Sequence, residues 1–387
     1  MASHGTVALG SGAARPGQGW NHSGTPTPLI HSWDSAGSAV GLFANLGERI
    51  RNFNRARVTK TEIAQTPRRL VWAINKARLY RYTSPLPAEK RVPIPFLLVF
   101  SIMNRSSIFD LRRGNSFVEY MLARGFDVYL LDWGVPGYED RNLRLDDYAL
   151  EYLPRAIRKM KAIAGSSEFS MLGWCIGAII TTIYAALLPD DGLRNLLLLT
   201  APLDFSNREA STLARWTDGK YFNVDRLLAT FGNVPGELID SGARALKPVE
   251  NYVTSFCKLW DNLDDPRAVE SWQAMNTWVC DTVPMAGAAY RQLIVNLYRN
   301  NELINNKMKV RDQVVDLGAV RANLLTVIAK TDHITPPCQS ESILEKVGSK
   351  DKEAFHVSGG HVGSMAGSGA RRTTWPRIAG WLEERSR

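Results

Sequence analysis

Short apolar segments alternate along most of the chain with segments whose apolar residues recur at helical spacing. The apolar runs predict buried β-strands at residues 96–101, 127–132, 168–172, 195–200, 323–329 and 354–357. The helical periodicity predicts helices at residues 115–124, 147–164, 175–188, 339–347 and 375–385. This alternation is typical of a mostly parallel sheet joined by crossover helices, and it predicts the α/β fold class.

Two regions depart from the alternation. Residues 204–320 are helical in pattern and lie between two predicted strands, which predicts an inserted helical cap. Residues 1–60 are rich in glycine, serine and proline, which predicts a disordered or weakly ordered tail with a short helix at 38–53. A further helix is predicted at 68–80. The α/β core is therefore expected to comprise residues 61–203 and 321–387.

Composition and charge narrow the class of protein. With 45% hydrophobic and 22% charged residues, the chain is expected to be globular. No apolar run reaches the roughly 18 to 20 residues of a membrane span, and the N-terminus has no secretory pattern, so we expect a cytoplasmic protein. The net charge of +9 comes from dispersed basic residues without interleaved aromatics, which argues against nucleic acid. It is compatible with ordinary solubility or with attraction to an anionic substrate, partner or surface.

The four cysteines are scattered and lack metal-ligand spacing, so we expect free thiols and no metal. One of them, Cys175, stands in Gly173-x-Cys175-x-Gly177, between an apolar strand and an Ala- and Ile-rich helix. This is the nucleophile-elbow pattern of α/β-hydrolases with cysteine in place of serine. A thiol at a helix N-terminus is favoured as thiolate, so Cys175 is the predicted nucleophile rather than a buried structural cysteine.

A cysteine nucleophile of this kind needs a base and an acid. Three of the six histidines lie in the predicted tail, which leaves His333, His356 and His361. His356 falls in a predicted strand and is expected to be a packed or hydrogen-bonded core residue, whereas His361 follows the last strand in a glycine-rich loop and is the predicted base. Asp332 ends the preceding strand and is the predicted acid, which gives the nucleophile–Asp–His chain order of this fold.

The same fold supplies an oxyanion hole from two backbone amides. One is expected from Ile176, the residue after the nucleophile. The other is expected from the loop after the strand at 96–101, where Ile102 and Met103 are both candidates.

From residue 66 to the C-terminus, about four-fifths of the chain, the sequence resembles polyhydroxyalkanoate synthases, most closely the class III catalytic subunit. The matching segments are NRSSIFDL at 104–111, DVYLLDWG at 127–134, the cysteine box at 173–177, TAPLDF at 200–205, FGNVPGE at 231–237, DHI at 332–334 and GHVG at 360–363. By this resemblance the family's catalytic cysteine, aspartate and histidine fall on Cys175, Asp332 and His361.

The resemblance implies a polyester synthase on an α/β-hydrolase fold. It would take 3-hydroxyacyl-CoA, load the acyl group on Cys175 and extend a polyester with release of coenzyme A. No cofactor is implied, because coenzyme A arrives with the substrate. Asp332 would either orient His361 or help to activate the 3-hydroxyl. The resemblance further implies a second synthase subunit, a preference for short acyl chains and association with polyester granules. We also expect a homodimer that forms through the tryptophan-containing cap predicted at 204–320.

The chain departs from the family pattern at two places. Ala178 stands where a second glycine is usual after the cysteine box, and Ser106 and Ser107 replace the expected proline or aromatic residues beside Asn104 and Arg105. Two other functions are compatible with the same scaffold: a thioesterase, esterase or depolymerase that uses water as acceptor, and a granule-associated scaffold without catalysis. The first would yield free hydroxy acid, and the second could not acylate Cys175.

Overall fold

The structure, a computed structural model, describes residues 35–386, with side chains described from residue 44 onward. The chain divides at residue 50 into two compact units. The described part of the first unit is the N-terminal part of α1 (Ser35–Val58), and residues 51–386 form the second. The helix predicted at 38–53 is present as α1, which extends further at both ends, whereas residues 1–34 of the predicted tail lie outside the described residues.

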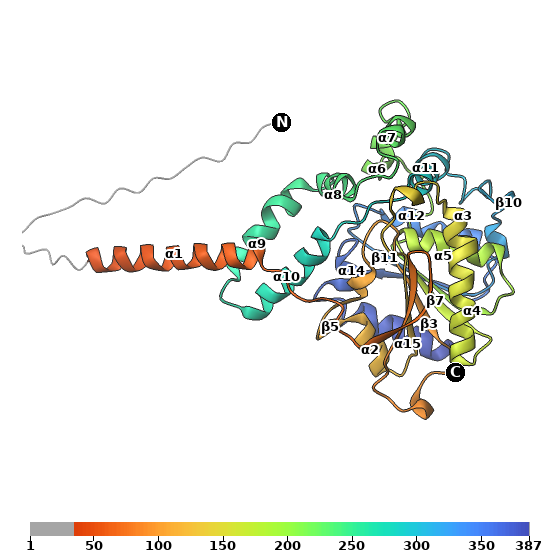
Figure 1. The fold of residues 1–387 in the computed structure, drawn as a ribbon, viewed down its shortest axis with the longest axis horizontal. Helices are drawn as coiled ribbons and strands as arrows, with labels where there is room; N and C mark the ends of the chain where they lie inside the picture. Colours follow the sequence, from red (N-terminus) through yellow and green to blue (C-terminus); the bar gives the residue numbers. More distant parts are fainter. Residues whose placement is uncertain (1–34, 387) are drawn as a thin grey trace, which may run out of the picture. The chain divides into compact units, whose positions relative to one another are not determined.

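An eight-stranded sheet forms the centre of the second unit (Figure 1). Its strands, in spatial order, are β1 (Arg68–Ile74), β2 (Ala77–Tyr82), β6 (Val128–Asp132), β3 (Phe96–Val99), β7 (Phe169–Trp174), β8 (Leu193–Leu199), β11 (Asn323–Ala329) and β12 (Lys352–Val357). The strands from β6 to β12 pair in parallel, and β1 and β2 add an antiparallel edge. All six predicted strands are present, with ends within two residues of those predicted. The predicted mostly parallel α/β sheet is confirmed.

Helices cover both faces of the sheet, because successive residues of each buried strand point to opposite sides. In β8, Leu196 and Leu198 join the core on one face, whereas Leu197 and Leu199 join the core on the other. The first face is covered by α4 (Leu153–Ala164) and α5 (Ile176–Leu187), and the second by α2 (Phe117–Ala123), α14 (Gly363–Ala366) and α15 (Thr374–Arg385) (Figure 1). Among residues 35–386, no helix is long and apolar enough to cross a bilayer.

The helix predicted at 68–80 was wrong: this segment forms the antiparallel hairpin β1–β2. The turn between Ile74 and Ala77 contains Asn75 at φ 49°, in the left-handed region that asparagine tolerates. The apolar residues Leu70, Val71, Ile74 and Leu79 fit helical spacing, but Leu79 instead pairs with Leu131 of β6. Pairing with a strand about 50 residues further along the chain therefore overrides the local pattern.

Two other predicted helices are divided in the structure. The segment at 339–347 forms α12 (Pro337–Glu341) and α13 (Ile343–Lys346), and the segment at 147–164 begins with α3 (Leu145–Asp147) and a π-helical turn at Tyr148–Tyr152 before α4. The helix at 115–124 begins only at Phe117, because Asn115 and Ser116 form β5 (Asn115–Ser116) against β4 (Asp110–Arg112).

The residues between β8 and β11 are mainly helical. They form α6 (Thr212–Trp216), α7 (Val224–Phe231), α8 (Gly236–Ala245), a π-helical turn at Glu250–Thr254, α9 (Ser255–Asp261), α10 (Pro266–Cys280), α11 (Gly287–Gln292), the π-helix η6 (Leu293–Arg299) and the short hairpin β9 (Lys309–Val310) and β10 (Gln313–Val314). We call residues 204–320 the insertion.

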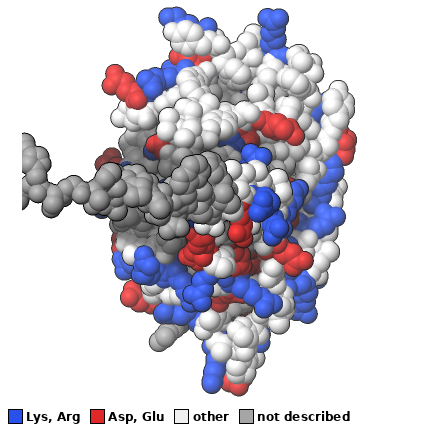
Figure 2. Space-filling model, turned by 90° about the vertical axis from the view of Figure 1, so that its left-hand side faces the viewer, with Lys and Arg blue, Asp and Glu red and all other residues white. Residues whose placement is uncertain are grey.

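Charged side chains of both signs are spread over the surface. On the face drawn in Figure 2, basic and acidic residues are interspersed, without one continuous basic area. Ion pairs join several of them, for example Arg124 with Glu383 at 2.7 Å. All four cysteines lie in the described part of the chain, and none forms a disulfide.

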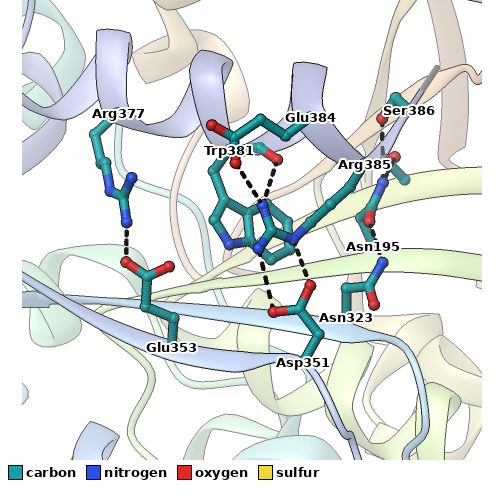
Figure 3. Close-up of polar contacts among 10 residues, drawn as sticks. Asn195, Asn323, Asp351, Glu353, Arg377, Trp381, Glu384, Arg385 and Ser386 are labelled. Carbon is teal, nitrogen blue, oxygen red and sulfur yellow. Dashed lines mark hydrogen bonds and ion pairs between the residues drawn. The ribbon is translucent and has the colours of Figure 1, made fainter.

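A polar cluster fixes the C-terminal helix at the start of the central strands (Figure 3). Asn195 at the start of β8 is fully buried, donates to Ser170 of β7 at 2.9 Å and to Ser386 at 3.1 Å, and accepts from Asn323 of β11 at 2.9 Å. Nearby, Arg385 pairs with Asp351 at 2.6 Å and lies over the Trp381 ring. Because a buried polar group costs stability when it loses its partners, this cluster depends on Asn195.

We predict that Asn195→Ala lowers the free energy of unfolding by about 2 kcal/mol, because the buried hydroxyls of Ser170 and Ser386 and the half-buried amide of Asn323 lose a shared partner. The matched control is Arg377→Gln, which breaks the more exposed pair with Glu353 and should cost about 0.5 kcal/mol or less. Urea unfolding followed by tryptophan fluorescence measures both. Equal losses for the two variants would contradict the role assigned to the buried cluster.

Candidate active site

Cys175 occupies a sharp turn between β7 and α5. Its backbone has φ 57° and ψ −123°, a conformation that non-glycine residues rarely adopt and that costs about 1–3 kcal/mol. Its amide donates to the Leu199 carbonyl of β8 at 3.1 Å, which ties the turn to the neighbouring strand. The predicted elbow is therefore present, and the thiol lies at the N-terminus of α5 at the carboxyl end of a central strand.

The two glycines of the box are required by space. A Cβ on Gly173 would lie 2.2 Å from Thr181 Oγ1 and 2.7 Å from Ala178 Cα, and a Cβ on Gly177 would lie 2.4 Å from the Val99 carbonyl oxygen. These distances are far below van der Waals contact, so neither position accepts a side chain without displacing backbone. Ala178, where the family pattern has glycine, is fully buried, and its amide donates to the Cys175 carbonyl at 2.9 Å.

The structure brings His361 and Asp332 together with Cys175. His361 Nδ1 lies 2.7 Å from Asp332 Oδ2, and the His361 ring lies beside Cys175 in the same cavity, close enough for the thiol to influence the pKa of the imidazole. His361 lies in the loop between β12 and α14, and Asp332 follows β11. Both are buried, at 7% and 6% exposure. The sulfur, the imidazole and the carboxylate thus form one chain of contacts at the carboxyl ends of three strands.

Asp332 is held by more than the histidine. Its Oδ1 accepts hydrogen bonds from the amides of Ile334 and Thr335, both at 2.9 Å, while its Oδ2 contacts His361. Its side chain is fully buried. Because both oxygens are engaged, the carboxylate has a fixed position from which it orients the imidazole.

The surroundings of His361 favour its protonated form. Burial alone would lower its pKa, but the negative charges of Asp332 and Cys175, and the hydrogen bond with Asp332, outweigh burial and raise the pKa to about 10. An imidazolium between a carboxylate and a sulfur is the electrostatic arrangement that a cysteine nucleophile needs.

His333 and His356, which were not predicted as the base, are not part of this chain of contacts. His356 is on β12, but it was wrongly expected in the core: it is exposed, and its Nε2 pairs with Glu341 at 2.8 Å, because β12 is the edge strand. His333 is half-buried beside Asp332, and burial lowers its pKa despite that carboxylate.

The candidate oxyanion amides lie in the two segments beside Cys175 from which the sequence predicted them. Ile176 is the first residue of α5, where helix amides lack an intrahelical acceptor. Met103 lines the same cavity as Cys175, and its amide donates to Ser101 Oγ at 3.3 Å; Ile102 is buried in the same loop. Trp278 of α10 fixes this loop by donating from Nε1 to the Arg105 carbonyl at 2.8 Å.

The serines that depart from the family pattern follow that loop. Ser106 is buried, and Ser107 Oγ is buried without a hydrogen-bond partner among the described residues. They begin a short 3₁₀ turn, and the Ile108 and Phe109 side chains of that turn pack in the core.

Two cavities meet at His361. The inner cavity, of about 240 Å³, contains Cys175 and is walled mainly by apolar side chains of the insertion, among them Leu213, Leu238, Ile239, Leu293 and Ile294. The side cavity, of about 380 Å³, is lined by more polar residues, among them Arg244, Asn251, Asn276 and His333. Asn104, Trp278 and His361 border both. A substrate with one apolar and one polar part has room on either side of the histidine.

Several residues that line the cavities were not predicted as site residues from the sequence. Tyr290 and Tyr298 line the inner cavity, although no periodicity or motif marked their side chains as site residues. Asn104, which borders both cavities, belongs to a segment that matched the family but was not predicted as a site residue. Of the four tryptophans of the insertion, Trp278 and Trp272 line a cavity, whereas Trp216 is 46% exposed.

Comparisons with known proteins agree with this geometry. Residues 111–365 match the family model described as alpha/beta hydrolase fold. A solved structure of a lipase candidate from Sulfolobus solfataricus has a TM-score of 0.53 over 82% of this chain and 99% of that chain, at 13% identity, and supports the fold alone.

Comparison with similar protein sequences shows the family. The Poly(3-hydroxyalkanoate) polymerase subunit PhaC of Haloferax mediterranei is 33% identical, covering 92% of this chain and 70% of that protein. The proteins of the same name from Allochromatium vinosum and Synechocystis are 33% and 30% identical, covering 88% and 89% of this chain and 94% of each relative. The resemblance inferred from the motifs is confirmed. The chain therefore belongs to the poly(3-hydroxyalkanoate) polymerase family and is an acyltransferase built on the α/β-hydrolase fold.

Proposed function

We propose that this polyester synthase transfers (R)-3-hydroxyacyl groups from coenzyme A thioesters to Cys175 and from there to a growing polyester, with release of coenzyme A. The observation that carries the proposal is the contact of His361 with both Asp332 and Cys175 beside the apolar inner cavity. Cys175, Asp332 and His361 are the proposed catalytic residues.

In the loading step, His361 holds the proton of the Cys175 thiol while the sulfur attacks the thioester carbonyl carbon. The negative oxygen of the tetrahedral intermediate is stabilised by the Ile176 amide and by an amide of the loop that contains Ile102 and Met103. The carbon–sulfur bond to coenzyme A then breaks, and its thiolate takes the proton from His361. The acyl group remains on Cys175 as a thioester, so its carbonyl stays activated.

In the extension step, His361 accepts the proton of a 3-hydroxyl group whose oxygen attacks the thioester on Cys175. A carbon–oxygen ester bond forms, the bond to Cys175 sulfur breaks, and the proton on His361 restores the starting pair. Asp332 orients His361 in both steps, a role supported by its full burial and by the engagement of both its oxygens.

The two cavities suit the two parts of such a substrate. The apolar walls of the inner cavity match a short hydroxyacyl group and the polyester behind it, and the amides and imidazole of the side cavity match the polar pantetheine arm. Coenzyme A enters as part of the substrate, and no resident cofactor is invoked.

The family membership supports further proposals about assembly and location. We expect a homodimer, full activity only with a second, non-homologous synthase subunit, and residence at polyester granules in the cytoplasm. Names of the relatives with the word subunit agree with a multi-subunit enzyme.

We predict that Cys175→Ala abolishes both coenzyme A release and polymer formation from 3-hydroxybutyryl-CoA. Cys338→Ala, a half-buried cysteine on α12 outside both cavities, is the matched control and should keep activity. Coenzyme A is measured with a thiol reagent, and the precipitate is analysed by methanolysis. Release with only free 3-hydroxybutyrate would identify a hydrolase instead, and undiminished release by Cys175→Ala would exclude this nucleophile.

We predict that Asp332→Asn lowers kcat by about 100-fold or more, because His361 loses its orienting carboxylate. The pKa of His361, raised to about 10 in the wild type, should fall towards or below the ordinary value of about 6.5, since burial then prevails. NMR titration of labelled histidine measures this change. A His361 pKa that is unchanged in the variant would refute the electrostatic assignment.

The same pair has a consequence for stability. A histidine whose pKa is raised by folding stabilises the protein fully below the unfolded value of about 6.5, and that contribution is lost as pH rises through the folded value of about 10. We therefore predict that the wild type loses unfolding free energy between these pH values and that Asp332→Asn loses less. Urea unfolding at a series of pH values checks this difference.

A further inference from the structure

A buried tyrosine lines the inner cavity without a role in the steps above. Tyr298 is 8% exposed and shares the cavity wall with Cys175 and His361. It belongs to η6, a π-helix that continues α11. Single π-helical turns inside helices are frequent at functional sites.

Tyr298 lies on the cavity-lining face of this helical segment. Tyr290, Ile294 and Tyr298 are spaced four residues apart, which places their side chains on one face of a helix, and all three line the inner cavity. The 3.1 Å hydrogen bond from the Asn300 amide to the Val295 carbonyl shows the π-helical bonding of η6.

The ring of Tyr298 is held by a polar framework outside the cavity. It packs on Phe205 with ring centroids 4.3 Å apart, and the Phe205 amide donates to Asn301 Oδ1 at 2.9 Å. Asn301 Nδ2 in turn donates to Asp204 Oδ1 at 2.8 Å, and Asp204 Oδ2 accepts from Ser342 at 2.7 Å. The ring therefore has a fixed position relative to the sheet.

The hydroxyl of Tyr298 is an available donor. Among the hydrogen bonds of residues 44–386 we find none to this hydroxyl, although the charges of Cys175 and Asp332 act on it. Burial raises the pKa of Tyr298, and those negative charges raise it further, so the phenol keeps its proton. Tyr298 lines the cavity that contains the nucleophile, so a substrate oxygen bound there can accept from its hydroxyl.

We propose that Tyr298 is a further substrate-contacting residue, whose hydroxyl donates a hydrogen bond to the 3-hydroxyl oxygen of the unit that attacks the acyl-enzyme. The inference rests on the proposed function and adds a specific contact to its extension step. The 3-hydroxyl gives its proton to His361 and accepts from Tyr298 with a lone pair. The contact strengthens as negative charge develops on the attacking oxygen while the new ester bond forms and the Cys175 thioester breaks. Tyr298 keeps its own proton throughout.

The test is Tyr298→Phe, which removes one oxygen and keeps the ring contact with Phe205. With 3-hydroxybutyryl-CoA in rapid mixing, the variant should load Cys175 at the wild-type rate, seen as the first coenzyme A released per chain. Its later turnover should fall by about 10- to 100-fold, mainly in kcat. Thermal unfolding should be unchanged, because the hydroxyl has no protein partner to lose.

Butyryl-CoA separates the two steps, because it lacks the 3-hydroxyl. Wild type and Tyr298→Phe should acylate Cys175 with it at equal rates, as measured by intact mass. The matched control is Tyr152→Phe, which removes a hydroxyl bonded to Asn75 Nδ2 at 3.0 Å outside the inner cavity and should leave turnover unchanged.

Each other outcome overturns the inference. Slower loading of butyryl-CoA by Tyr298→Phe would place its action on the thioester rather than on the 3-hydroxyl. An equal loss of both steps with earlier unfolding would make its role structural, and unchanged turnover would remove any role. If the wild type itself is not acylated at Cys175 by either thioester, the proposed function fails, independently of Tyr298.

Discussion

The architecture depends on the close approach of β7, α5 and β3 at the nucleophile. Cys175 has a backbone conformation that is unfavourable for any side chain, and it is held there because Gly173 and Gly177 allow neighbouring backbone to come closer than a Cβ would permit. The amide of Cys175 is fixed by β8, and the start of α5 follows at once. This packing exposes the sulfur at the carboxyl ends of the strands, where the loops after β11 and β12 deliver the aspartate and the histidine.

Burial gives these groups their electrostatic character. A carboxylate in the interior is stable only when its oxygens are engaged, and Asp332 meets this condition with two amides and one imidazole. The same low-polarity surroundings strengthen the attraction between that carboxylate and His361. Burial of the pair therefore has two opposite effects on the pKa of the imidazole. Desolvation lowers the pKa of His361, whereas the neighbouring negative groups raise it by more, so the protonated form is favoured. The strand ends thus create a charged site inside an otherwise apolar core.

The insertion encloses this centre in a cavity. Its helices supply most of the apolar wall of the inner cavity, and Trp278 connects α10 to the loop after β3 through the Arg105 carbonyl. Asp204, the first residue of the insertion, accepts a hydrogen bond from Asn301, which follows η6, and so connects the residues after β8 to the segment that contains Tyr298. A movement of the insertion would therefore displace the loop that contains the oxyanion candidates, and it would also displace Tyr298. The side cavity, whose lining is more polar, borders the same histidine.

The sequence by itself determined the central strands and the presence of helices between them, and it singled out Cys175, Asp332 and His361 as the proposed catalytic residues, because each depends on a local pattern: an apolar run, a strand end, or glycines around a turn. It could not determine the β1–β2 hairpin, because the apolar residues of this segment fit helical spacing. Only the pairing of Leu79 with β6 in the tertiary structure makes the segment a strand. The exposure of His356 followed from the position of β12 at the edge of the sheet, which is a property of strand order rather than of any one strand. The cavities, the engagement of both Asp332 oxygens and the position of Tyr298 were likewise decided only by the tertiary structure. These features join residues far apart in the chain, and no local pattern of a single segment records such contacts.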